Sequence, residues 1–285
     1  MSVRSAAQDG LAIIAGRGAL PRLLAEEAAR SQSTYRIVRF APAPFDWEAG
    51  HPVIEAEFEK PGRLFSDLRR AGCDRVVFAG GMTRPSLNPL RFDLKLMRLA
   101  PKLLPRLKGG DDDTLRVLAT IFEEAGFRMV AAHDILADLV MPAGVQTRAA
   151  PNPADRSDAE RAARIVAALG SVDVGQAAVV AQGVCLGIES IQGTDVLLRF
   201  VRDTATGLRP DPEGARGVLF KGPKPGQDRR MDLPAIGPET VIRASEAGLA
   251  GIVLEAGGAL LLERSATLSA ADAAGLFIWG REPDG

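Results

Sequence analysis

Short apolar segments alternate with segments of helical periodicity in the first part of the chain, and this alternation restricts the folds open to it. Residues 11–16 (LAIIAG) are apolar, a glycine turn follows, and residues 23–32 then carry apolar side chains at helical spacing. The same features recur as a strand at 35–41, a helix at 62–72 and a strand at 74–81. Such alternation is typical of βα units around a parallel sheet. The sequence therefore predicts an α/β protein.

A proline-rich segment divides the chain into two parts. Residues 141–155 (MPAGVQTRAAPNPAD) hold three prolines and little apolar periodicity, as expected of a domain boundary. Beyond it we expect a helix over 157–170, paired strands across Gly183, and further alternating helices and strands. We therefore predict two domains, a Rossmann-like parallel-sheet domain over residues 1–145 and an α/β domain over residues 146–285.

The composition excludes several classes of protein. The 35 basic and 36 acidic residues give a net charge of −1, and no long basic tract offers a nucleic-acid footprint. No apolar run approaches the roughly 20 residues of a spanning helix, and the N-terminus lacks the apolar core of a signal peptide. Cys73 and Cys185 lie in or beside apolar runs, where small buried residues are expected. We predict a cytoplasmic protein without nucleic-acid partners or a transmembrane segment.

Two glycine turns follow predicted strands, at the edge where open α/β sheets bind ligands. Gly16 and Gly18 belong to the first turn, and the second turn continues through Gly81 to Thr83 and Arg84. Their backbone N–H groups, hydroxyl and guanidinium predict contacts with the phosphate or hydroxyl groups of a substrate. Tight turns without a ligand, ending in an ordinary surface arginine, are the alternative.

Two acidic segments stand where helices are expected to begin. Asp111 and Asp112 belong to a run of three aspartates, and Thr194 and Asp195 end the segment QGTD. Helix capping accounts for one acidic residue at each helix start. The remaining groups could bind a cation or sugar hydroxyls, so Asp111, Asp112 and Thr194 are candidate substrate ligands and Asp195 a candidate metal ligand.

The segment 221–237 (KGPKPGQDRRMDLPAIG) concentrates charged groups between two apolar segments. Its prolines and glycines oppose regular structure, so the charges are expected on a rigid loop. Lys221 and Lys224 suit phosphate oxygens, whereas Asp232 suits a hard divalent cation such as Mg²⁺ and could share it with Asp195. This pattern predicts phosphoryl chemistry, with a solvated charged connection as the alternative.

Seven blocks of the sequence resemble, in the same order, the LpxI family of UDP-2,3-diacylglucosamine pyrophosphatases. The resemblance spans nearly the whole chain, and several of the blocks are long and irregular. The blocks are IAGRGALP, AGGMTRP, KGGDDDTLR, AHDILADLVMPAGV, QGTD, KGPKPGQDRRMDLPAIG and AGLAGIVLEAG.

The resemblance implies hydrolysis of UDP-2,3-diacylglucosamine to UMP and lipid X, 2,3-diacylglucosamine 1-phosphate, in lipid A biosynthesis. It implies a Mg²⁺-dependent homodimer, peripheral to the inner membrane, with a substrate- or lipid-binding N-terminal domain and a catalytic C-terminal domain. Asp232 matches the essential acidic residue of the family, while Lys221, Lys224 and Asp195 lie in matching blocks. Gln227, in the same segment as Asp232, is a candidate substrate ligand. The resemblance also suggests that water attacks the sugar-side phosphorus. Arg17 departs from the family's glycine-rich first turn.

Two other functions remain open on the sequence. A non-catalytic regulatory protein could bind a UDP-sugar or lipid through the same glycine turns. An oxidoreductase would need a dinucleotide fingerprint, but Pro21 stands where a third glycine is required. Residues 92–107 (FDLKLMRLAPKLLPRL) could line an apolar place for acyl chains, although ordinary core packing is the interpretation that we favour.

Overall fold

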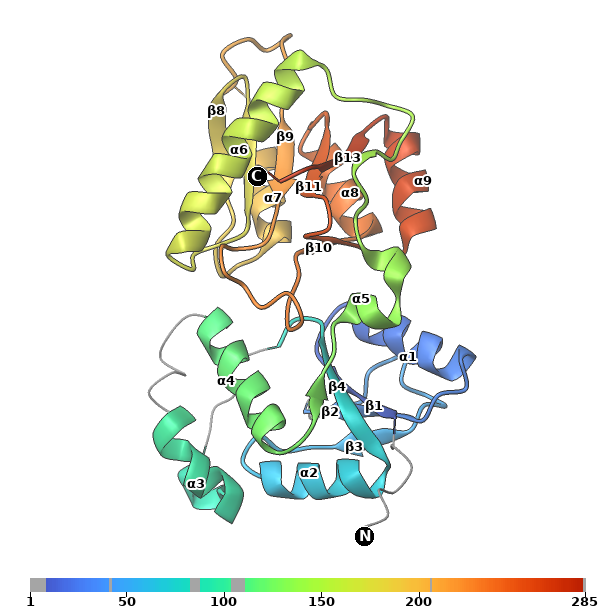
Figure 1. Cartoon of the computed structure of the whole chain (residues 1–285). Coiled ribbons are helices and arrows are strands. Elements are labelled where there is room, and N and C mark those ends of the chain that lie inside the picture. The colour runs from blue at the N-terminus through green and yellow to red at the C-terminus, as the bar shows by residue number, and fades with distance from the viewer. Residues whose placement is uncertain (1–8, 41–42, 83–87, 104–110, 206, 284–285) are drawn as a thin grey trace. The chain divides into compact units, whose positions relative to one another are not determined.

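The computed structural model describes residues 9–40, 43–82, 88–103, 111–205 and 207–283; it excludes the side chains of 102–103 and 111–113. The chain separates into two compact units, and both are drawn in Figure 1. Unit 1 consists of Met1–Ala137 and Arg230–Asp232, whereas unit 2 consists of Asp138–Arg229 and Leu233–Gly285. The chain therefore returns to unit 1 for three residues within the charged segment 221–237.

Unit 1 contains a parallel sheet with the strand order β3-β2-β1-β4-β5. This order reverses direction between β1 and β4, as in dinucleotide-binding folds, and it confirms the predicted Rossmann-like parallel sheet. The described elements are β1 Gly10–Ala15, α1 Leu20–Arg30, β2 Tyr35–Arg39, β3 Val53–Glu55, α2 Pro61–Arg70, β4 Cys73–Ala79, η1 Pro89–Arg91, α3 Leu94–Leu103, α4 Asp111–Glu124, β5 Arg128–Met129 and α5 Ala132–Ile135. The short helix η3 Ala137–Leu139 begins at the last residue of this part of unit 1 and continues into unit 2.

The unit 1 sheet is apolar because helices cover it. All six residues of β1 are buried, which explains the continuous apolar run at this position. One face packs against α2, α3 and α4 through an aromatic cluster in which Phe65 and Phe78 both contact the ring of Phe122. The packing of these aromatic rings thus fixes the positions of the helices that line the apolar cavity of this unit.

Unit 2 contains a six-stranded mixed sheet with the order β6-β13-β11-β9-β7-β8 and a two-stranded parallel sheet, β10-β12. Strands β9, β11 and β13 are parallel, whereas β6, β7 and β8 pair antiparallel with their neighbours. The described elements are β6 Gly144–Val145, α6 Pro153–Ser171, β7 Ala177–Ala181, β8 Val184–Ile188, α7 Thr194–Thr204, β9 Val218–Lys221, β10 Ala235–Ile236, α8 Pro238–Glu246, β11 Gly251–Glu255, β12 Leu260–Leu261, α9 Arg264–Ala274 and β13 Phe277–Arg281.

Both faces of the unit 2 sheet are buried. Leu219 and Ile252 belong to the cluster formed with α7, α8 and α9, whereas Phe220 and Val253 belong to the cluster formed with α6. Neighbouring strand residues therefore serve opposite faces, as the two-residue period of a strand requires. The predicted pairing of two strands across Gly183 is confirmed as the β7–β8 hairpin.

One expectation about the cysteines is wrong. Cys73 is buried in β4, where burial raises the pKa of its thiol, but Cys185 is exposed. The cause is the position of β8 at the edge of its sheet, where most of its residues face solvent or lie half-buried. An apolar run at a sheet edge does not bury every side chain that it contains.

Candidate functional site

Unit 2 buries a cluster of three polar side chains: Glu189, Thr194 and Lys221, each less than one-tenth exposed. The Lys221 ammonium donates to Thr194 Oγ1 at 2.6 Å, and this hydroxyl donates to Glu189 Oε1 at 2.8 Å. Lys221 Nζ lies 3.8 Å from Glu189 Oε1. The threonine hydroxyl thus links a buried cation to a buried anion. Burying these two charged side chains removes them from water, which costs folding free energy.

The strand order brings these three residues together. Lys221 is the last residue of β9, and its register partner on the neighbouring β7 is Ala177. Glu189 directly follows β8, and its N–H donates to the carbonyl of the same Ala177 at 2.8 Å. Thr194 is the first residue of α7, entered through Gly193 at a φ of +85°. The cluster therefore rests on two strand ends and one helix start.

The charges of Lys221 and Glu189 offset each other within the cluster, so the positive end of a helix dipole remains. Thr194 lies at that end, at the N-terminus of the 11-residue helix α7. Among the described residues, Glu189 Oε2 is buried without a hydrogen-bond partner. The sequence placed Lys221 and Thr194 among the candidate ligands, but Glu189 was not among them because an acidic residue after a strand carries no distinctive pattern.

The loop after Lys221 is held by its own polar groups. Lys224 pairs with Asp173, and its N–H donates to the amide oxygen of Gln227 at 3.0 Å. Gln227 N–H donates in return to the carbonyl of Lys224 at 3.1 Å. These contacts hold the loop in one conformation. They also pair the Lys224 ammonium with the Asp173 carboxylate and the Gln227 amide oxygen with the Lys224 N–H.

Asp232 lies in the three-residue segment that belongs to unit 1. Met231 is buried in the unit 1 core, and the Arg230 guanidinium pairs with Glu123 of α4 at 3.0 Å. Asp232 itself is exposed, and Leu233, with which the chain re-enters unit 2, is buried. An exposed carboxylate thus stands between two anchored apolar residues, which restrict the backbone that carries it.

The two glycine turns of unit 1 pair with each other through their backbones. Arg17 N–H donates to the Gly81 carbonyl at 2.8 Å, and Gly81 N–H donates to the Arg17 carbonyl at 3.0 Å. A Cβ on Gly16 would lie 2.6 Å from the Gly81 carbonyl oxygen. This close approach explains why glycine is needed at Gly16. At Gly18 an added Cβ would meet no atom within 4 Å, but the φ of +99° favours glycine there. The two turns therefore lie next to each other, as expected.

The remaining predicted site residues are Asp195 on α7, Asp111 and Asp112 on α4, and Thr83 and Arg84. Asp195 is exposed in the first turn of α7 and lies 3.5 Å from Arg243 Nε, a salt-bridge distance. Helix α4 begins at Asp111, as expected, but the side chains of Asp111 and Asp112 are not described. Thr83 and Arg84 lie outside the described residues.

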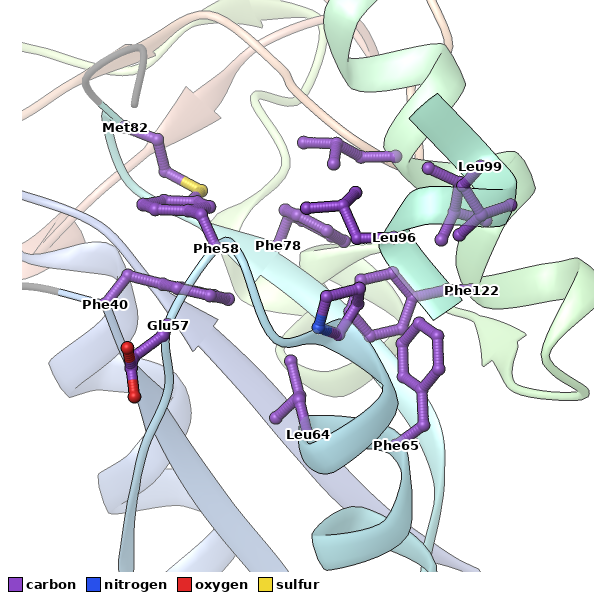
Figure 2. Close-up of a pocket in the computed structure, with 13 residues that line it drawn as sticks. Phe40, Glu57, Phe58, Leu64, Phe65, Phe78, Met82, Leu96, Leu99 and Phe122 are labelled. Atoms are coloured by element: carbon purple, nitrogen blue, oxygen red, sulfur yellow. The ribbon is translucent and has the colours of Figure 1, made fainter. Parts of the chain in front are cut away.

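Unit 1 also contains an apolar cavity of about 60 Å³. Figure 2 shows side chains of α2, α3 and α4 pointing into it, with Phe40, Phe58 and Met82 at one side. Glu57 is the one charged residue in its described lining, and the hydrogen bond from Lys60 lowers the pKa of this carboxyl. The cavity is therefore suited to hydrocarbon rather than to a polar ligand.

The described residues contain no group of three or more His, Cys, Asp or Glu side chains that could hold a metal ion. Mg²⁺ bound together with substrate phosphates needs only one or two protein carboxylates. Asp232 and Asp195 are both exposed and could supply such carboxylates, although Asp195 also lies at salt-bridge distance from Arg243.

The fold and these polar clusters define a two-unit α/β protein with the groups expected of a phosphoryl-transfer hydrolase. Residues 10–139 match the LpxI N-terminal domain, and residues 142–279 match the LpxI C-terminal domain. The UDP-2,3-diacylglucosamine pyrophosphatase LpxI of Caulobacter vibrioides is 41% identical over 276 residues, covering 96% of this chain and 98% of the relative. The chain belongs to the LpxI family, which confirms the resemblance found in the sequence.

Proposed function

We propose that this chain hydrolyses the diphosphate of UDP-2,3-diacylglucosamine to UMP and lipid X in lipid A biosynthesis. The observation that carries the assignment is the end-to-end match to the Caulobacter LpxI enzyme, which includes both domains. The chain is accordingly a hydrolase of a phosphoric anhydride. Water supplies the oxygen that forms the new P–O bond, and the P–O–P linkage between the two products breaks.

Unit 2 is proposed to bind the diphosphate through Lys221 and the N-terminus of α7. The support is the 2.6 Å hydrogen bond that fixes the Lys221 ammonium on Thr194, at a positive helix end. A cation held in advance at a fixed place stabilises the negative charge that grows on the leaving phosphate. Lys224 would add a second positive charge next to the diphosphate if its ammonium left the Asp173 carboxylate and paired with the substrate phosphates.

Asp232 is proposed to orient the attacking water and to hold Mg²⁺ together with the substrate phosphates. Its exposure makes the carboxylate oxygens accessible, and the flanking Met231 and Leu233 fix the backbone. Bound Mg²⁺ would offset the charge of the diphosphate. Asp195 is proposed as a second carboxylate for the same ion.

Unit 1 is proposed to bind the lipid part of the substrate. Its cavity is lined by phenylalanine, leucine, isoleucine and methionine side chains, and a volume of about 60 Å³ suits the end of one acyl chain. Gly18 and Gly81, with Thr83, Arg84, Asp111 and Asp112, are proposed to contact the polar part of the substrate. A homodimer and a cytoplasmic location at the inner membrane complete the proposal.

Release of UMP from UDP-2,3-diacylglucosamine by the purified chain tests the assignment. We expect product with Mg²⁺ present, and loss of product after EDTA treatment. The Asp232→Ala variant should bind substrate without turnover, and unchanged circular dichroism would show that it is folded. Stoichiometric binding by the unmodified chain without any UMP would instead identify a UDP-sugar- or lipid-binding regulatory protein.

A further inference from the structure

The segment 89–98, which comprises η1 and the first half of α3, exposes apolar side chains on its outer side. Leu90 is 95% exposed, Leu94 71% and Met97 50%, so three large apolar residues within eight positions face away from the core. Leu96 and Leu99 of the same helix point into the apolar cavity, as Figure 2 shows. The helix therefore has apolar residues on two sides, although packing against unit 1 requires only one.

Basic residues accompany the exposed apolar ones. Arg98 is exposed on α3 next to Met97, and Lys95, which is half-buried with its Cβ near Gly62 of α2, lies next to Leu94. The single acidic residue between positions 89 and 103 is Asp93. The outer side of α3 is therefore both apolar and positively charged.

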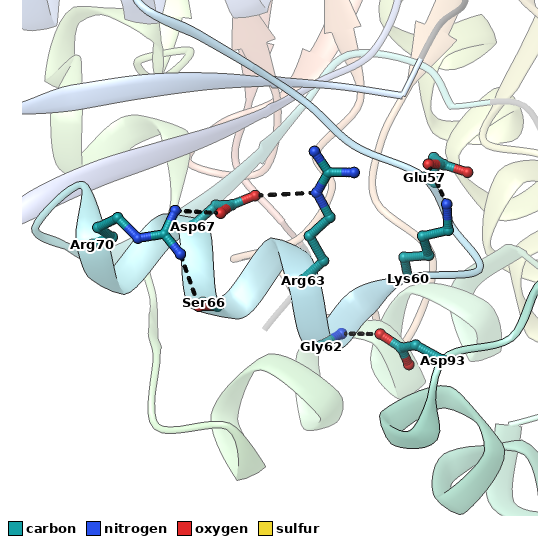
Figure 3. Close-up of polar contacts among 8 residues, drawn as sticks. All are labelled: Glu57, Lys60, Gly62, Arg63, Ser66, Asp67, Arg70 and Asp93. Atoms are coloured by element: carbon teal, nitrogen blue, oxygen red, sulfur yellow. Dashed lines mark hydrogen bonds and ion pairs between the residues drawn. The ribbon is translucent and has the colours of Figure 1, made fainter.

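Asp93 is committed to backbone groups and does not neutralise this surface. Its Oδ1 accepts from Leu96 N–H at 2.7 Å, which caps the start of α3. Its Oδ2 accepts from Gly62 N–H, also at 2.7 Å, at the start of α2 (Figure 3). One carboxylate thus ties two helix N-termini together and fixes which side of α3 faces outward.

We propose that the outer side of the segment 89–98, formed by Leu90 of η1 and by Leu94, Met97, Lys95 and Arg98 of α3, docks on an anionic lipid bilayer. Amphipathic segments that combine exposed leucine or methionine with Lys and Arg bind at the lipid interface, where the apolar side chains enter the headgroup boundary and the cations meet anionic lipids. Unit 1 itself supplies the apolar cavity on the inner side of the same helix. The inference rests on the proposed function insofar as a diacyl substrate must be drawn from a bilayer.

Charge complementarity favours a membrane over a second copy of the chain. In a twofold dimer the same patch meets itself, so Lys95 and Arg98 would face the cations of the partner copy. An anionic bilayer instead attracts both cations and takes up the leucines and the methionine. No described helix is long and apolar enough to cross a membrane, so a docking surface of this kind would act from one leaflet.

Co-sedimentation with vesicles tests the proposal. The full chain is mixed with vesicles of phosphatidylethanolamine and phosphatidylglycerol, or with neutral phosphatidylcholine vesicles. We expect binding to the anionic vesicles that weakens as salt is raised, because screening shortens the reach of the cations. The Lys95→Gln/Arg98→Gln variant should bind roughly 30-fold more weakly, since each basic residue near such a surface contributes about 5-fold. The Leu94→Gln/Met97→Gln variant should lose roughly 10-fold or more.

Matched controls lie on unit 2. Ile191→Gln changes an equally exposed apolar residue, and Arg161→Gln/Arg164→Gln removes two exposed cations of α6. Both controls should bind vesicles like the unmodified chain. Hydrolysis of detergent-dispersed substrate should be unchanged in all variants, whereas hydrolysis of vesicle-embedded substrate should fall only in the α3 variants. A chain that failed to hydrolyse the dispersed substrate would refute the proposed function without bearing on vesicle binding.

Two results would overturn the docking proposal. One is undiminished vesicle binding by both α3 variants. The other is an analytical ultracentrifugation result in which Leu94→Gln/Met97→Gln converts a dimer to a monomer while vesicle binding persists. The second result would identify the surface as an interface between copies of the chain.

Discussion

Replacing Lys221 and Glu189 singly and together tests whether the buried cluster is one energetic unit. Lys221→Met keeps the length of the side chain but leaves the Glu189 carboxylate buried, with Oε2 already lacking a described partner. Glu189→Leu leaves the Lys221 ammonium buried with only the Thr194 hydroxyl. The double variant removes both charges at once. The energy of the pair therefore appears as a departure from additivity.

The distance between the charges sets the expected size of this departure. At 3.8 Å between Lys221 Nζ and Glu189 Oε1, an effective dielectric constant of about 20 gives an attraction of about 4 kcal/mol. Removing one partner of a buried pair costs roughly 3–5 kcal/mol, because the other charge stays desolvated and unpaired. We expect each single variant to lower the free energy of unfolding of unit 2 by about 3 kcal/mol, and the double variant to fall short of the sum by roughly 2–4 kcal/mol.

Urea unfolding followed by Trp279 fluorescence measures these values on unit 2. The chain has two tryptophans, so a Trp47→Phe background leaves Trp279 on β13 as the single reporter. The pair Arg148–Asp272 is a control, because its charges lie at 3.6 Å but the arginine side chain is 89% exposed. Its replacement by the same scheme should give no measurable coupling. Additive effects of Lys221→Met and Glu189→Leu within about 0.5 kcal/mol would refute a coupled cluster.

Three further variants probe the chemistry, the fold and the pH dependence. Under the role proposed for Asp232, Asp232→Asn should abolish UMP release while its circular dichroism stays that of the folded chain; full turnover would end the assignment. Gly80→Ala places a Cβ against the Arg17 carbonyl at a φ of +82°, so thermal unfolding should show a loss of about 2 kcal/mol or more. Burial raises the pKa of Asp155, so its contribution to stability is lost as pH rises through that pKa. Asp155→Asn should remove this loss, as urea midpoints between about pH 4 and pH 7 would show.

Local periodicity accounts for most of the fold that could be predicted. The apolar run of β1 and the helical spacing that follows it are signals within a few residues, and the glycine turn marks their junction. The strand β3 escaped prediction because its three residues are half-buried or exposed and carry no apolar run. Cys185 was misjudged for a related reason, since only the sheet order shows that β8 is an edge strand.

The site could be predicted only where charge stood out against an apolar context. Lys221 ends the buried strand β9, and Thr194 begins a helix after a glycine, so both positions are conspicuous in the sequence. Glu189 joins them because β8 folds back on β7 and brings its end beside the end of β9, which no local pattern encodes. Gly16 also has a structural role that no local pattern indicates, because the absence of a Cβ lets the Gly81 carbonyl of the second turn approach its backbone.

The position of Asp232 depends on its neighbours more than on its own side chain. Arg229 belongs to unit 2 and pairs with Glu255 at 2.9 Å, whereas the next two residues belong to unit 1, where Met231 enters the core and Arg230 pairs with Glu123. A carboxylate on an ordinary solvated loop would lose conformational entropy each time that it met a substrate. Here the packing of Met231 and the ion pair of Arg230 restrict the backbone next to Asp232 within unit 1. The role that we propose for Asp232 in hydrolysis would therefore use a carboxylate whose backbone is ordered before substrate binds.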